Sequence, residues 1–189
     1  MNLPNKLTIA RLLLCVLFVV FWSIEGHFRG ATLLIIFGAA SLTDWLDGNI
    51  ARKYNLITDF GKLFDPLADK ILISIAFIGL MLQQLVPFWI VVCIIAREFL
   101  ITGLRTLAAS KGIVLSAEQM GKNKTISQMI TALVGLLILA WQDARFALCI
   151  LDDMKLYLLL PLVALTLVFT VYSGLMYYIK NRKLLFEIT

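Results

Sequence analysis

The chain has 189 residues, of which 61% are hydrophobic and 15% are charged, and its formal net charge is +5. A soluble domain is closer to half apolar and a quarter charged, so this composition excludes an ordinary soluble protein and predicts an all-α integral membrane protein. The positive charge requires no nucleic-acid partner, because a basic cytoplasmic rim suits anionic lipids. No Ser/Gly-rich linker interrupts the sequence, and we expect residues 1–189 to form a single domain.

Six apolar segments follow one another, each long enough to cross a bilayer at about 20 residues. They cover roughly residues 8–25, 31–52, 61–82, 87–108, 123–141 and 156–179. The start of the chain, MNLPNKLT, predicts a short N-terminal interfacial helix, with Lys6 and Arg11 facing lipid headgroups. The first apolar segment is followed by no small-residue cleavage site, so we expect a retained transmembrane helix.

The distribution of Lys and Arg predicts the orientation in the membrane. With the N-terminus inside, six spans return the C-terminus to the same side, and the far-side loops hold only Arg29, Arg145 and Lys155. The positive-inside rule therefore places both termini in the cytoplasm. Without an Arg/Ser-rich transit sequence, we expect the inner (plasma) membrane of a bacterium. His27 and Asp143, near the far-side loops, are expected to be solvated.

An acidic stretch, TDWLDGNIARKYNLITDFGKLFDPLADK, crosses the cytoplasmic ends of the second and third segments. Asp44 and Asp47 are three residues apart on the second segment, so they share one helix face. Asp65 and Asp69 are four residues apart on the third segment and share a face for the same reason. Two antiparallel helices joined by a short loop can direct both faces at one cavity, so the sequence predicts four carboxylates close together.

Four bare carboxylates in one cavity would repel one another, and burying them is costly. Two divalent cations would neutralise them, and all-oxygen ligands favour Mg²⁺, Mn²⁺ or Ca²⁺ over zinc. Paired divalent ions suit displacement at phosphorus because they stabilise the attacking and leaving oxygens together. Alternatively, the aspartates cap helices and lie in water, which suits Asp59 and Asp65 better than Asp44, about two turns inside its segment.

Small and basic residues accompany these aspartates. Gly48, Ala51 and Gly61 would let a ligand lie close to the helix backbone. Arg52 and Lys62 flank the site and are suited to binding phosphate charge. The cytoplasmic ends of the two segments therefore combine possible metal ligands with a possible phosphate pocket.

The complete pattern, D-x₂-D-G-x₂-A-R-x₈-G-x₃-D-x₃-D from Asp44 to Asp69, resembles the signature of the CDP-alcohol phosphotransferases, and every fixed position matches. The six-segment layout agrees with this family, and the resemblance covers essentially the whole chain. Asn5, Thr8 and Arg11 in PNKLTIAR also resemble the N-terminal segment of the family, although this signal is less specific.

The resemblance implies a dimetal enzyme that moves a substituted phosphate from a CDP-linked donor to an alcohol and releases CMP. By this analogy four aspartates ligate two divalent cations, Mg²⁺ or Mn²⁺: Asp44, Asp47, Asp65 and Asp69. Asp69 would also act as the general base on the acceptor hydroxyl. The CDP-binding residues implied are Asn5, Thr8, Gly48, Ala51, Arg52, Gly61 and Lys62.

Basic residues in the fourth and fifth segments predict the acceptor. Arg97 and Arg105 are eight residues apart, roughly on one helix face, and Lys122 and Lys124 open the fifth segment. A charge near the centre of a span costs about 2.5–3.5 kcal/mol on insertion scales, so it requires a partner or a function. Together these cations predict an acceptor that carries its own phosphate. Alternatively, Arg97 pairs with Glu98 and only joins helices, Arg105 reaches the headgroups, and the lysines are an ordinary cytoplasmic flank.

The segments REFLITGLR and GKNKTISQM resemble those of the phosphatidylglycerophosphate synthases. This resemblance implies CDP-diacylglycerol and glycerol 3-phosphate as substrates, the lipid bilayer as the setting, and a homodimer. Another acceptor, such as inositol phosphate or a phospholipid, is the alternative within the family. From a different class, a divalent-cation transporter is possible because acidic clusters in membranes mark ion paths. However, the acidic residues crowd one end of two helices, and the outer half carries no second cluster.

Overall fold

The structure is a computed structural model that describes the backbone of residues 3–54, 59–110, 119–144 and 153–188. It describes the side chains of these residues except at 3–6, 45–54, 59–66, 119–122, 156 and 183–188. Every regular element in this part of the chain is a helix, which confirms the predicted all-α class. The elements are α1 (Leu3–Trp22), α2 (Arg29–Tyr54), α3 (Asp59–Leu82), α4 (Phe88–Ser110), α5 (Gln119–Asp143), the π-helix η1 (Lys155–Leu159) and α7 (Leu160–Ile188).

The helices follow the predicted apolar segments in order. Apolar runs of this length form helices in a bilayer because a helix satisfies its backbone polar groups internally. Helix α1 continues without a break from Leu3 to Trp22, so the N-terminal residues lead directly into the first apolar segment. Two described stretches are long and apolar enough to cross a membrane, and a third is a shorter apolar helix: Asn123–Asp143, Tyr157–Arg182 and Leu7–Trp22. The helical, apolar chain is consistent with a membrane protein, and the six-span count and the interfacial helix stay predictions.

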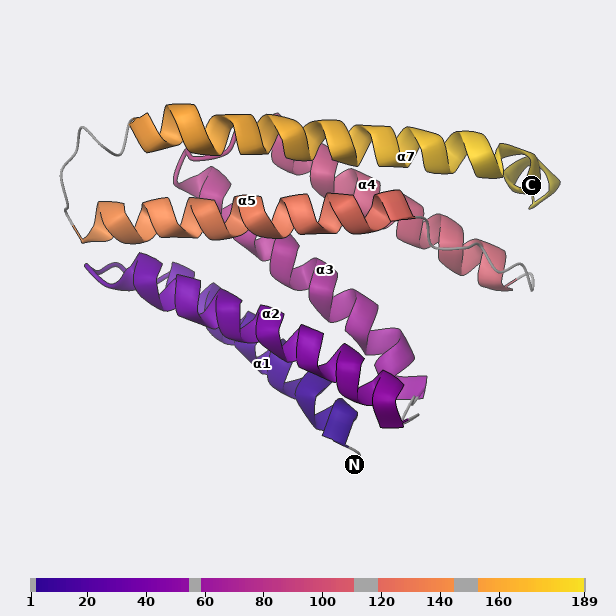
Figure 1. The fold of residues 1–189 in the computed structure, drawn as a ribbon, viewed down its shortest axis with the longest axis horizontal. Helices are drawn as coiled ribbons and strands as arrows, with labels where there is room; N and C mark the ends of the chain where they lie inside the picture. The colour runs from indigo at the N-terminus through magenta and orange to yellow at the C-terminus, as the bar shows by residue number, and fades with distance from the viewer. Residues whose placement is uncertain (1–2, 55–58, 111–118, 145–152, 189) are drawn as a thin grey trace.

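Successive helices run in opposite directions (Figure 1). The start of α1, the end of α2, the start of α3, the end of α4, the start of α5 and the end of α7 all lie toward the right of that view. Helix α1 packs on α2 and α3, α5 contacts α2, α3 and α7, and α4 contacts α3 and α7. This end therefore carries both the acidic segment of α2 and α3 and the basic residues of α4 and α5.

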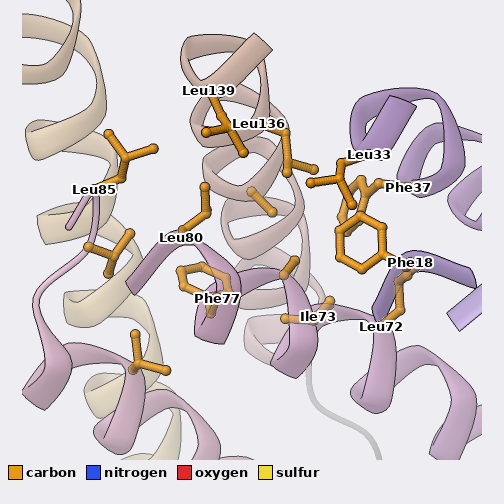
Figure 2. Packing of buried hydrophobic residues seen from close by; sticks show 14 of the residues in the cluster. Phe18, Leu33, Phe37, Leu72, Ile73, Phe77, Leu80, Leu85, Leu136 and Leu139 are labelled. Carbon is orange, nitrogen blue, oxygen red and sulfur yellow. The ribbon is translucent and has the colours of Figure 1, made fainter. Parts of the chain in front are cut away.

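One apolar core joins α1, α2, α3 and α5 (Figure 2). The ring of Phe18 lies edge-on to Trp22 and tilted against Phe37, with both pairs of ring centroids 6.1 Å apart. Leu72 and Leu136 extend this core along α3 and α5. Large apolar side chains are also exposed on the outer faces, among them Leu13, Val16, Ile35, Phe99 and Val168. A helix bundle that is apolar inside and outside has the surface expected in contact with lipid.

At the opposite end of the bundle, α2 and α5 are joined by polar contacts. Arg29 Nη2 lies 3.2 Å from Asp143 Oδ1, and the backbone N–H of Gly30 donates to Asp143 Oδ2 at 2.8 Å. Both ion-paired side chains are mostly buried, so the prediction that Asp143 is solvated was wrong. A Cβ atom at Gly30 would lie 2.4 Å from the backbone nitrogen of Ala140, so glycine permits this close approach of the two helices.

The turn between α3 and α4 ends the third helix with a defined hydrogen-bond pattern. The N–H of Leu85 donates to the carbonyl of Leu80, and that of Gln84 donates to Met81, both at 2.9 Å. Gln84 has a φ of 57°, in the left-handed region that glycine usually occupies at such a helix end. Pro87 stands immediately before α4, and its carbonyl accepts a hydrogen bond from the N–H of Ile90 at 3.1 Å.

Candidate active site

An ion pair joins the N-terminal helix to the acidic segment. Arg11 Nη1 on α1 lies 2.7 Å from Asp44 Oδ1 on α2. The Arg11 side chain is only 1% exposed, whereas that of Asp44 is 45% exposed. The prediction that Arg11 faces lipid headgroups was therefore wrong: a buried guanidinium requires a counter-charge, and the carboxylate of Asp44 supplies it.

Asp69 lies beside this ion pair. It is on α3, which contacts both α1 and α2, and its side chain is partly buried. Its carboxylate is within electrostatic range of Asp44 and Arg11, and also of Lys124 and Glu98. Two of the four predicted carboxylates thus lie in one neighbourhood, and a basic residue of α5 lies nearby.

The other predicted residues of this site lie mainly outside the described side chains. Asp47 and Asp65 are on the helical backbones of α2 and α3, at the spacing that places each on the face of its partner aspartate. Thr8 is fully buried on α1, three residues before Arg11. Besides these two aspartates, seven predicted residues lie where the side chains are not described: Asn5, Gly48, Ala51, Arg52, Gly61, Lys62 and Lys122.

The chemistry of the donor set suits divalent cations. Carboxylate oxygens are ligands that Mg²⁺ and Mn²⁺ prefer, and Asp44 and Asp69 are brought together by the packing of α2 and α3. Among the described side chains, no three His, Cys, Asp or Glu residues form a group that could hold a metal ion. Because Asp47 and Asp65 fall outside that set, the metal site stays a prediction.

Glu98 is the centre of a buried polar cluster. Its Oε1 accepts a hydrogen bond from Lys124 Nζ of α5 and lies 3.3 Å from Arg97 Nη1 of its own helix. Arg97 Nη2 also donates to Ser173 Oγ of α7 at 3.1 Å. On α3, Lys70 Nζ donates to Thr102 Oγ1 of α4. The cluster therefore connects four helices.

The two arginines of α4 face the same neighbouring helix. Arg97 contacts Ser173, and the guanidinium of Arg105 lies over the ring of Tyr177, 5.3 Å from its centroid. This distance is within the range of a cation–π interaction. Ser173 and Tyr177 are four residues apart on α7, so the eight-residue spacing of the arginines directs both toward that helix.

The sequence left open whether these basic residues bind phosphate or only pair with neighbouring residues, and the structure answers part of this question. The pairing of Arg97 with Glu98 is present. Lys124 is 4% exposed and bound to Glu98, so it is not an ordinary cytoplasmic flank. Lys70 was not selected as a site residue from the sequence, although its position directly after Asp69 was a signal that it lies near the site. The bond between Glu98 and Lys124 was also missed, because helical spacing does not reveal contacts between helices.

Comparisons with known proteins give this site its context. The family model for CDP-alcohol phosphatidyltransferase matches residues 1–172. A CDP-diacylglycerol–glycerol-3-phosphate 3-phosphatidyltransferase of Bacillus subtilis is 43% identical over an alignment of 197 positions, which covers 95% of each chain. The enzyme of that name from Rickettsia felis is 42% identical over 128 positions, covering 68% of this chain and 71% of the relative.

A third relative comes from Mycobacterium tuberculosis and is named a probable phosphatidylglycerophosphate synthase. It is 38% identical over 141 positions, which cover 73% of this chain and 66% of the relative. The family match begins in α1 and ends at residue 172, in the first half of α7. It therefore includes the aspartate pattern, the Arg11–Asp44 ion pair and the Glu98–Lys124 contact, and stops one residue before Ser173. The chain belongs to the CDP-alcohol phosphatidyltransferase family.

Proposed function

We propose that the protein transfers the phosphatidyl group from CDP-diacylglycerol to glycerol 3-phosphate, giving phosphatidylglycerophosphate and CMP. The observation that carries this proposal is the 43% identity, over 95% of the chain, to a Bacillus subtilis enzyme named for this reaction. The site geometry supports it, because Asp44 and Asp69 lie beside a buried cluster of cations. The first group suits chemistry at phosphorus, and the second suits an acceptor that carries phosphate.

Two divalent cations, Mg²⁺ or Mn²⁺, would neutralise phosphate charge and make CMP a better leaving group. The residues that would hold them are Asp44, Asp47, Asp65 and Asp69. Arg11 fixes one oxygen of Asp44 and so limits the orientation of that carboxylate. The remainder of the CDP pocket would be formed by Asn5, Thr8, Gly48, Ala51, Arg52, Gly61 and Lys62.

Asp69 is the proposed general base. Its carboxylate takes the proton of the acceptor hydroxyl, whose oxygen attacks the phosphorus attached to diacylglycerol, and the bond from that phosphorus to CMP breaks. The phosphate of glycerol 3-phosphate binds the basic residues Arg97, Arg105, Lys122 and Lys124. Lys124 is within electrostatic range of Asp69, so an acceptor bound there by its phosphate can present its hydroxyl to the base.

The setting of this reaction is part of the proposal. Six spans would leave both termini and the active site on the cytoplasmic side of a bacterial inner membrane, where glycerol 3-phosphate is dissolved. CDP-diacylglycerol would enter sideways from the inner leaflet. We propose one catalytic domain over residues 1–189 and a homodimeric assembly.

An acceptor screen tests the proposed function. The purified protein in detergent is supplied with CDP-diacylglycerol, Mg²⁺ or Mn²⁺, and one acceptor at a time: glycerol 3-phosphate, inositol phosphate, serine or phosphatidylglycerol. Release of CMP is measured, and we expect it with glycerol 3-phosphate. Release with inositol phosphate but not with glycerol 3-phosphate would overturn the choice of acceptor. Cation flux through the protein without nucleotide dependence would overturn the enzyme class.

A further inference from the structure

We propose that Glu98 is a positioning residue for the acceptor site, because it holds Arg97 of α4 and Lys124 of α5 on one carboxylate oxygen. This proposal rests on the proposed function, in which both cations bind the phosphate of glycerol 3-phosphate. Glu98 itself does not contact the acceptor. Its role is to fix the separation and direction of two basic side chains that come from different helices.

The contacts show that Arg97 and Lys124 interact with the same carboxylate oxygen. Glu98 Oε1 accepts from Lys124 Nζ and is 3.3 Å from Arg97 Nη1, so one oxygen atom joins the two cations. The three side chains are between 5% and 15% exposed, which removes most of the water that could otherwise solvate them. In such surroundings a carboxylate determines where its cationic partners lie more strongly than it would in water.

The cluster has more basic than acidic side chains, so it is suited to binding an additional anion. Lys70, Arg97 and Arg105 lie within electrostatic range of one another, and Lys124 completes a set of four basic side chains. Glu98 is the carboxylate that Lys70, Arg97 and Lys124 share, with Asp69 at the edge of the cluster. Arg105 is exposed, but the charges of Arg97 and Lys124 are mostly buried, and buried charge is costly unless it is paired. A phosphate dianion would bring the charge of the cluster closer to zero, and Glu98 keeps the cations together until it binds.

Arg97 also has a buried N–H donor, at Nε, that is available to bind an acceptor oxygen. Its two terminal nitrogens are engaged by Glu98 and Ser173, whereas its Nε is buried and has no hydrogen-bond partner in the described part of the chain. A buried donor without an acceptor is destabilising, and an acceptor oxygen on the bound phosphate would recover this free energy. The stem of Arg97 packs against Gly174, where a Cβ atom would lie 3.2 Å from Cγ, so α7 also limits its position.

The central test replaces Glu98 by Gln, which keeps the shape but removes the charge that holds the two cations. We expect the KM for glycerol 3-phosphate to rise at least tenfold, while the KM for CDP-diacylglycerol stays within twofold. Glu98→Asp keeps the charge but is one methylene shorter, and we expect it to raise the same KM at least threefold. CMP release is measured at varied concentrations of each substrate.

Asp143→Asn is the matched control, since it breaks a mostly buried ion pair of α2 and α5 at the opposite end of the bundle. We expect this control to lower the Tm without changing either KM. Equal changes in both KM values for Glu98→Gln and Glu98→Asp, or no change in the KM for glycerol 3-phosphate, would overturn the positioning role. Absence of acceptor-dependent CMP release by the unsubstituted protein would instead overturn the proposed function.

Discussion

At the scale of single residues, the site depends on two contacts between charges of different helices. Arg11 with Asp44 joins α1 to α2, and Lys124 with Glu98 joins α5 to α4. Asp69 lies within electrostatic range of both pairs. A carboxylate placed between the proposed nucleotide-binding segment and a cationic cluster is in a suitable place to take a proton from an acceptor bound by its phosphate.

The change Asp69→Asn removes the proposed base and keeps the volume of the side chain. General base catalysis contributes about 10²–10⁴-fold, so we expect CMP release to fall at least a hundredfold. Binding of CDP-diacylglycerol, measured by calorimetry with purified protein, should change by less than tenfold because most of the donor pocket is intact. An Asp69→Asn variant with more than a tenth of the original rate would contradict the role of this residue.

At the scale of helices, the opposite end of the bundle tests how closely α2 and α5 must pack. A Cβ atom at Gly30 would lie within 2.6 Å of backbone atoms of Leu139 and Ala140. Backbone cannot rotate away as a side chain does, so Gly30→Ala must separate the two helices. We expect a loss of about 1–3 kcal/mol of unfolding free energy, the usual cost of overpacking, measured by thermal or denaturant unfolding in detergent.

The matched control is Gly38→Ala, on the same helix. Within the described part of the chain, a Cβ atom at Gly38 would meet nothing within 4 Å beyond the backbone of its own helix. Alanine there should leave stability unchanged or raise it by up to about 1 kcal/mol, because glycine is a poor helix former. Equal effects of the two substitutions would show that the packing of Gly30 is not what limits this contact.

The turn that ends α3 offers a stabilising substitution. Gln84 adopts a φ of 57°, which costs a side-chain-bearing residue about 1–2 kcal/mol and costs glycine much less. We therefore expect Gln84→Gly to raise the Tm by several degrees, whereas Gln84→Ala should not. A Tm for Gln84→Gly at or below that of the original protein would argue against strain at this position.

The sequence predicted where the helices lie along the chain, but not which face of each helix is buried. Long apolar runs predicted the order and approximate limits of the helices, because backbone hydrogen bonding in lipid requires helices. In this chain both the core and the outer surface are apolar, as Phe18 and Val16 illustrate on α1, so periodicity does not distinguish them. The burial of Arg11 was not predicted for this reason. A basic residue near the start of an apolar segment suggested a position at the interface, and only the structure shows its partner on α2.

At the scale of the whole molecule, the alternating directions of the helices bring distant parts of the sequence to one end (Figure 1). The predicted proximity of the α2 and α3 aspartates required only a short loop and helical spacing. The contacts of the Glu98 cluster depend on the packing of α3, α4, α5 and α7. The sequence therefore indicated some of its residues as candidates but did not show which of them contact one another. Ser173 and Tyr177, on the last helix, carried no sequence signal that distinguished them from other polar residues.

The most direct measurement compares glycerol 3-phosphate with glycerol as acceptors for the purified protein and CDP-diacylglycerol. Each hydrogen bond to a charged group contributes about 1.5–3 kcal/mol, so two or three such bonds to the acceptor phosphate correspond to a factor of a thousand or more. We predict that kcat/KM for CMP release is at least a thousandfold higher with glycerol 3-phosphate. Comparable kcat/KM values for the two acceptors would contradict a phosphate site built from the cations of α4 and α5.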